Sequence, residues 1–134
     1  MKLYHGSPKK LKILIPFGAK GMNKFENQKV IFLCKTFNHA VLYAISKSLK
    51  GKTTFAIIPK KLFIVGKSHK PKTGYVYEVN VKKAKKGPRE QYAYFNKIKE
   101  FKITKVYPKN YQNKIVYVNK KEDLLKNLKC FPSN

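Results

Sequence analysis

The chain has 134 residues, of which 43% are hydrophobic and 13% aromatic, with two cysteines and no tryptophan. This length predicts a single domain over residues 1–134, and this composition excludes disulfide-rich, collagen-like and low-complexity proteins. Lys and Arg total 31 against 6 Asp and Glu, so the formal net charge is +25. Such a charge indicates a polyanionic partner, DNA or RNA, or else reflects the coding bias of an AT-rich genome.

The N-terminus carries no signal-peptide pattern, and the longest apolar run, Val30 to Cys34, is far too short to span a membrane. We therefore expect an intracellular protein, cytoplasmic or associated with the nucleoid or nucleus, with no membrane partner. Cys34 and Cys130 form no CxxC pair, and no His/Cys cluster has metal-ligand spacing. Both thiols are expected to be free, and no metal site is predicted.

The first part of the chain is predicted to be mostly extended. Its segments are an extended run over 2–5 closed by Gly6-Ser7-Pro8, a helical turn or strand over 11–15, a loop over 17–28, and a buried strand over 29–34. A helix follows, with Thr36 or Asn38 as its N-cap and its end near Ser48. The residues that share one face of this helix are Phe37, Ala40, Tyr43 and Ala44.

Short strands dominate the rest. They are predicted over 53–58, 62–65, 75–81, 90–95, 101–107 and 115–118, with basic turns or loops over 67–74 and 82–88. Asn119 stands three residues before Glu122 in a capping pattern, and an apolar stripe follows, so the chain is expected to end in a helix. The stripe consists of Leu124, Leu125 and Leu128. This order predicts an α+β domain with a mostly antiparallel, strongly curved sheet.

Few residues are available for polar catalysis. The chain has no P-loop, no Rossmann fingerprint and no GxSxG motif, and its scattered acids disfavour a paired-carboxylate glycosidase or a two-metal nuclease. What stands out is His5, at the end of a predicted strand and directly before Gly6-Ser7, where the backbone can approach a ligand closely. His39 and His69 are expected to lie on the surface.

Several short segments occur in a characteristic order. They are Leu3-Tyr4-His5-Gly6-Ser7, the strand Lys29–Cys34, the helix Phe37–Ala44, Gly74-Tyr-Val-Tyr-Glu-Val79, Arg89-Glu-Gln-Tyr-Ala-Tyr94 and Ile98–Val106. Together they resemble the ADP-ribosyltransferase superfamily, particularly its compact poly(ADP-ribose)-polymerase-like catalytic core. The resemblance covers about residues 2–107 and leaves residues 108–134 as a terminal strand and helix. It implies a curved, split sheet.

The resemblance also implies binding of NAD as a substrate and transfer of its ADP-ribose to an acceptor, such as nucleic acid or a nucleic-acid-associated protein. The residues that would bind NAD are His5, Gly6, Ser7, Phe32 and Tyr43. His5 and Glu90 would be the catalytic residues. The carboxylate of Glu90 would bind the ribose 2′-hydroxyl and stabilise the positive charge that develops as nicotinamide leaves. Phe32 replaces the family's usual tyrosine. It can stack on a ligand but has no hydroxyl for a hydrogen bond, a difference that bears on enzymatic activity more than on the fold.

Other functions stay open. A non-enzymatic basic nucleic-acid-binding domain would stack bases on Tyr75, Tyr77, Tyr92 and Tyr94. The lysines predicted to contact a polyanion are Lys67, Lys70, Lys72, Lys82, Lys83, Lys85 and Lys86. A catalytically degenerate member of the fold and a small basic ribonuclease using His5 are further alternatives. An RNA 2′-phosphotransferase is less favoured, because Arg89 is the only arginine available to grip a phosphate.

Overall fold

The computed structural model describes residues 1–18, 29–88 and 90–130. The elements are, in chain order, β1 (Lys2–Ser7), β2 (Phe17–Gly18), β3 (Lys29–Cys34), α1 (Phe37–Ser46), the 3-10 helix η1 (Lys47–Leu49), β4 (Phe55–Ile57), β5 (Leu62–Val65), β6 (Gly74–Asn80), β7 (Lys85–Lys86), β8 (Gln91–Tyr94), β9 (Lys102–Val106), the 3-10 helix η2 (Pro108–Lys114), β10 (Ile115–Val118) and α2 (Lys121–Cys130). The described chain is therefore α+β, with mostly antiparallel pairing, as the sequence predicted.

The larger sheet has the strand order β7-β8-β3-β1-β6-β9, with β2 added to β3. β1 pairs with β6 along its whole length, and β3 pairs with β8 over residues 31–34. The two central strands, β1 and β3, are in register at the pair Tyr4↔Cys34. Apart from that pair, β1 pairs with β6 and β3 pairs with β8. The sheet therefore consists of two halves that meet at one end of the boundary between β1 and β3.

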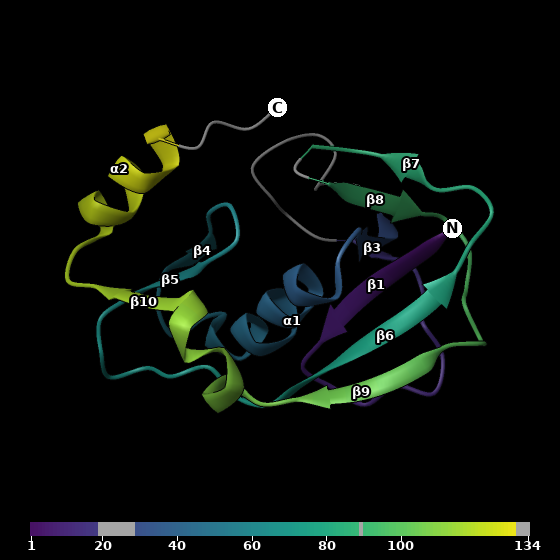
Figure 1. The fold of residues 1–134 in the computed structure, drawn as a ribbon, viewed down its shortest axis with the longest axis horizontal. Helices are drawn as coiled ribbons and strands as arrows, with labels where there is room; N and C mark the ends of the chain where they lie inside the picture. The colour runs from purple at the N-terminus through teal and green to yellow at the C-terminus, as the bar shows by residue number, and fades with distance from the viewer. Residues whose placement is uncertain (19–28, 89, 131–134) are drawn as a thin grey trace.

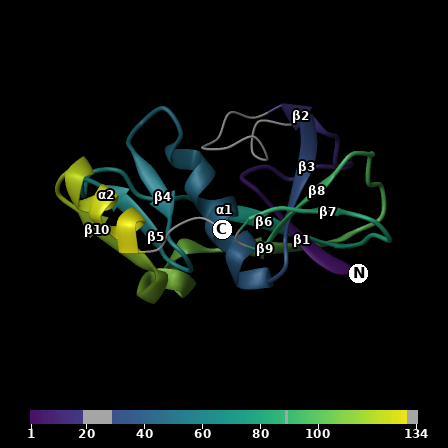
Figure 2. The ribbon, with the colours of Figure 1, turned by 90° about the horizontal axis from the view of Figure 1, so that it is seen from above.

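A smaller sheet has the order β10-β5-β4, in which β10 runs parallel to β5. α1 lies between the two sheets, and α2 covers the outer side of the smaller one (Figure 1). Seen from above, the smaller sheet and α2 occupy one end of the molecule and the larger sheet occupies the other (Figure 2). This layering puts one edge of α1 alongside the boundary between β1 and β3.

The start of α1 is fixed by its N-cap. Thr36 has an extended backbone, and its hydroxyl accepts a hydrogen bond from the backbone N–H of His39 at 3.2 Å. This is the usual way in which a threonine satisfies one of the free N–H groups of a first helical turn. Of the two predicted caps, Thr36 is therefore the cap, and Asn38 lies inside the helix.

Two glycines set the distance between α1 and the sheet. A Cβ on Gly6 of β1 would overlap the carbonyl oxygen of Ala40 and lie 2.8 Å from the backbone nitrogen of Ala44. A Cβ on Gly74 of β6 would lie 2.7 Å from the carbonyl oxygen of Ala44. Only glycine leaves room for this approach, and Ala40 and Ala44 are the small residues that the sequence placed on the buried face.

Both faces of the larger sheet are buried. The α1 face packs in a core cluster that joins the two sheets and includes Cys34, Ala40, Val41, Ile45, Leu62, Ile64, Val76 and Val106. The opposite face packs in a second cluster of Leu3, Leu14, Ile31, Leu33, Tyr77, Val79, Val81 and Ile98. Tyr77 and Val79 thus share the face that the alternating pattern of residues 75–81 predicted.

Several predicted boundaries are wrong. β1 continues through Gly6 and Ser7, because both pair with β6. Residues 11–15 form neither helix nor strand, although Leu14 makes one antiparallel bridge with Ile98. The expected loops over 17–28 and 82–88 contain the short strands β2 and β7. Residues 19–28 of the first loop lie outside the described residues.

The glycine contact gives a direct stability prediction. Gly6→Ala should lower the free energy of unfolding by about 3 kcal/mol, the upper part of the range for overpacking, because the Ala40 carbonyl belongs to a rigid helix and cannot move aside. Gly18→Ala is the matched control, since a Cβ there meets no atom of the described residues within 4 Å. Urea unfolding measures both values. Equal stability of the two variants would contradict the close contact.

Candidate functional site

The candidate site begins where β1 leaves β3. His5 follows Tyr4, the residue in register with Cys34, and its Nδ1 lies 2.8 Å from the carbonyl oxygen of Phe32. The imidazole therefore bridges the two halves of the sheet just beyond the point where β1 and β3 are in register. Its ring centroid lies 6.0 Å from that of Tyr77. His5 is 4% exposed.

The environment of His5 determines its charge and tautomer. Burial, and after it the nearby charge of Lys47, lower the pKa of His5 to about 4, and the hydrogen bond to Phe32 opposes this shift. His5 is thus neutral at physiological pH. A carbonyl oxygen can only accept a hydrogen bond, so Nδ1 carries the proton and Nε2 keeps its lone pair. Nε2 is then an acceptor suited to a hydroxyl or amide donor of a ligand.

The neighbours of His5 shape the same region. Ser7 is buried, and its hydroxyl accepts a hydrogen bond from the backbone N–H of Lys9 at 3.2 Å. Gly6 lies against α1. The direction in which a Cβ would point from Gly6 faces the helix backbone and is closed to a ligand. Phe32 is half-buried on β3 and supplies the carbonyl that fixes His5. These residues, all predicted to bind NAD, come together in the fold.

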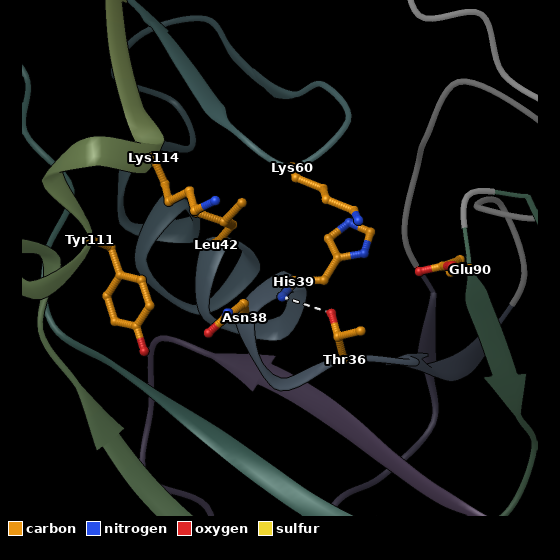
Figure 3. A pocket seen from close by; sticks show the side chains of 8 residues that line it. All are labelled: Thr36, Asn38, His39, Leu42, Lys60, Glu90, Tyr111 and Lys114. Atoms are coloured by element: carbon orange, nitrogen blue, oxygen red, sulfur yellow. Dashed lines mark hydrogen bonds between the residues drawn. The ribbon is translucent and has the colours of Figure 1, made fainter.

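Glu90 lies directly before β8, on the other side of β3 from His5. It is exposed and lines a pocket of about 160 Å³ at the N-terminal end of α1, with Thr36, Asn38, His39, Leu42, Lys60, Tyr111 and Lys114. In Figure 3 Glu90 enters from the β8 side, whereas Tyr111 and Lys114 come from the opposite side. His5 does not line this pocket. The two residues predicted to be catalytic lie two strands apart, because Tyr4 pairs with Cys34 and Cys34 pairs with Gln91.

The backbone of Glu90 is also unusual. The sequence placed Glu90 in a strand with Tyr92 and Tyr94, but β8 begins only at Gln91 and Glu90 has a φ of 61°. A non-glycine residue in this left-handed region costs about 1–2 kcal/mol. Such strain is often found at functional positions. The turn directs Glu90 into the pocket and away from the face on which Tyr92 and Tyr94 pack.

Tyr43 links the pocket to the rest of α1. Its hydroxyl accepts a hydrogen bond from the side-chain amide of buried Gln91 at 2.5 Å, and its ring lies 5.2 Å from that of His39. His39 and His69, both expected on the surface, are half-buried, so neither is fully exposed. His39, Tyr43 and Lys47 are spaced four residues apart and lie on one edge of α1. This row runs from the Glu90 pocket toward His5, whose pKa Lys47 affects.

The sequence analysis did not identify four residues of this region, which are Lys47, Gln91, Lys60 and Lys114. Lys47 lies one helical turn after Tyr43, so helix periodicity would have placed the two on the same edge. Nothing in the local sequence indicates that the Lys47 side chain is half-buried. Lys60 and Lys114 come from a turn and from η2, far apart in the chain, and meet at the pocket only because β5 and β10 pair.

The predicted basic segments are not adjacent. The connection from β5 to β6, which carries Lys67, Lys70 and Lys72, and the connection from β6 to β7 lie at opposite ends of the molecule (Figures 1 and 2). The seven-residue strand β6 separates them by roughly 23 Å. Lys67, Lys70, Lys72, Lys82, Lys83, Lys85 and Lys86 are all exposed. One compact ligand therefore cannot contact both segments.

The tyrosines proposed to stack on bases are occupied within the fold. Tyr77 is fully buried; its hydroxyl accepts a hydrogen bond from Leu11 at 2.6 Å and donates one to the carbonyl of Lys9 at 2.7 Å. Burial raises the pKa of this hydroxyl. Tyr75, Tyr92 and Tyr94 are half-buried against the same core cluster. Tyr77 at least cannot stack on a nucleic acid, so that part of the alternative is wrong.

Cys34 is a free, buried thiol, and burial raises its pKa to about 12. It is therefore an unreactive thiol at neutral pH. Among residues 1–18, 29–88 and 90–130, no group of His, Cys, Asp and Glu side chains has the arrangement of a metal site. In the same part of the chain, no helix is long and apolar enough to cross a membrane.

The chain was compared with protein-family models, with curated proteins and with solved structures, and none of these comparisons found a match.

The buried, neutral state of His5 predicts a pH dependence of stability. The unfolded chain binds a proton on His5 near pH 6.5, whereas the folded chain binds it only near pH 4. The stabilisation is complete above pH 6.5, and the free energy of unfolding should fall by up to about 3 kcal/mol as the pH decreases to 4.

Urea unfolding across this pH range tests the prediction. His5→Asn can still donate to the Phe32 carbonyl but cannot titrate, so it should lose this part of the pH dependence. His69→Asn, in the connection before β6, should keep the profile of the wild type. A wild-type profile in His5→Asn would show that His5 is not buried in its neutral form.

Proposed function

We propose that the protein binds NAD beside His5 and transfers ADP-ribose from it to an acceptor. The observation that supports this most strongly is the neutral imidazole of His5, held by Phe32 where β1 and β3 separate, with its Nε2 available as an acceptor. A hydroxyl-rich ligand such as the ribose of NAD matches that acceptor. The resemblance of residues 2–107 to the ADP-ribosyltransferase core, with its split sheet, points in the same direction.

Glu90 is the proposed catalytic carboxylate. In the transfer, the bond between the ribose and nicotinamide breaks, its electron pair leaves with nicotinamide, and the acceptor forms the new bond to the ribose. A carboxylate hydrogen-bonded to the ribose 2′-hydroxyl stabilises the positive charge that develops between these events. The left-handed backbone of Glu90 and its place in the pocket beside α1 support a functional role. Tyr43, between this pocket and Lys47, is the proposed aromatic contact.

Glu90→Gln separates NAD binding from turnover. NAD at 100 times its dissociation constant stabilises a protein by about 2.7 kcal/mol, which should raise the unfolding midpoint by roughly 10 °C for both the wild type and Glu90→Gln. Nicotinamide release, followed by chromatography, should occur in the wild type and be lost in Glu90→Gln. Glu100→Gln, which changes another exposed acid, should still release nicotinamide. No stabilisation of any form by NAD would refute the proposal.

A second candidate function is non-enzymatic binding of nucleic acid. It is favoured by the formal net charge of +25 and by the exposed lysines of the β6–β7 connection and of β7. Lysines attract phosphates without reading base sequence, so this binding would be sequence-independent.

The net charge also bears on the acceptor of the proposed transfer. The pyrophosphate of NAD needs few lysines, and the remaining positive charge suggests that the acceptor itself is a nucleic acid or is bound to one.

Neutralising one basic segment tests this second function. The combined change of Lys82, Lys83, Lys85 and Lys86 to Gln should reduce the slope of log affinity against log salt by about 3, if all these lysines contact phosphates of single-stranded RNA or DNA. The control changes Lys99, Lys120, Lys121 and Lys126 to Gln, which removes the same charge elsewhere on the surface. Equal slopes for both variants would show that the β6–β7 segment has no special role.

A further inference from the structure

Lys47 is a covered cation that the proposed transfer does not use. It follows the last residue of α1, keeps helical backbone angles, and its side chain is half-buried. Its ammonium lies 5.4 Å from the centroid of the Phe17 ring, on β2. Since β2 pairs with β3, the side chain reaches from the end of α1 to the β3 half of the sheet.

Within residues 1–18, 29–88 and 90–130, no carboxylate is among the ionisable groups that act on Lys47. The ionisable groups that act on it are Cys34, a neutral thiol at physiological pH, and Lys50, a second cation. Burial lowers the pKa of Lys47, and Lys50 lowers it further. Covering a cation costs free energy unless an opposite charge accompanies it. The aromatic face of Phe17 offsets part of this cost, but it supplies no negative charge.

Lys47 also lies at a defined place in the candidate site. Its charge lowers the pKa of His5, and its side chain reaches the β3 half of the sheet, to which the His5 imidazole is hydrogen-bonded. It is one helical turn beyond Tyr43, on the same row of α1 that begins with His39 at the Glu90 pocket. An anion that contacts Lys47 would thus lie between His5 and the row that leads to Glu90.

We propose that Lys47 binds the pyrophosphate of a dinucleotide held beside His5. The identity of this dinucleotide as NAD rests on the proposed function, but the binding of a phosphate group by Lys47 does not. A lysine ammonium is a common ligand of phosphate, and a hydrogen bond between charged groups strengthens when water is partly excluded. The phosphate supplies a negative charge beside Lys47, while His5 accepts from an uncharged part of the same ligand.

Calorimetric titration with NAD and, separately, with inorganic pyrophosphate tests this assignment. Lys47→Met keeps the length of the side chain and removes its charge, and Lys47→Arg keeps the charge. Lys99→Met is the control, because Lys99 is exposed and is not among the groups that act on Lys47. Lys47→Met should raise the dissociation constants for both ligands about ten- to a hundredfold, whereas Lys99→Met should change neither. Lys47→Arg should restore most of the affinity.

The outcomes separate this assignment from the proposed function. If the wild type binds pyrophosphate through Lys47 but does not bind NAD, the phosphate site stands and the proposed transfer fails. If NAD binds equally well to the wild type and to a folded Lys47→Met, the proposed function stands and Lys47 is not its phosphate ligand. Failure of the wild type to bind either ligand would overturn the role of Lys47. Thermal unfolding confirms that each variant is folded.

Discussion

The close contact of α1 with β1 and β6 determines the geometry of the whole site. Gly6 and Gly74 have no side chains toward the helix, so the backbone of Ala40 and Ala44 lies almost directly on the sheet. With these positions fixed, the adjacent edge of the same helical turns presents His39, Tyr43 and Lys47 along the β3 half of the sheet. A larger residue at either glycine would move that row away from His5 and Gln91.

The second constraint is the division of the larger sheet. β1 and β3 are in register at Tyr4↔Cys34 and then follow different partners, which leaves backbone groups near His5 without the usual neighbouring strand. The imidazole of His5 takes over this role by donating to the Phe32 carbonyl. One residue therefore holds the two halves together and presents a neutral acceptor at the same place. A stabilising contact and a candidate ligand contact thus share one side chain, which explains why His5 is buried yet suited to binding.

The sequence predicted the strands of the core well, because buried strands such as Lys29–Cys34 and residues 62–65 carry continuous or alternating apolar patterns. It failed at β2 and β7, whose two residues each become strands only by pairing with a neighbour. The strands that carry His5 and Phe32 could be predicted, whereas Ser7 was expected in a turn and its place in β1 was not predicted. The separation of Glu90 from His5 could not be predicted, because it depends on the left-handed turn before β8 and on the direction of a side chain. Lys47 was missed for the related reason that its burial is a property of the folded contact with Phe17.

The central claim is that His5 is a neutral imidazole, protonated on Nδ1, whose Nε2 accepts a hydrogen bond from NAD. Nitrogen-15 NMR of the histidine side chains at pH 7, recorded with and without saturating NAD, tests it most directly. The account predicts that Nδ1 of His5 is protonated in the free protein and that the Nε2 resonance of His5 shifts when NAD is added, while the tautomer stays the same. A charged His5, a proton on Nε2, or a His5 spectrum unaffected by saturating NAD would contradict it.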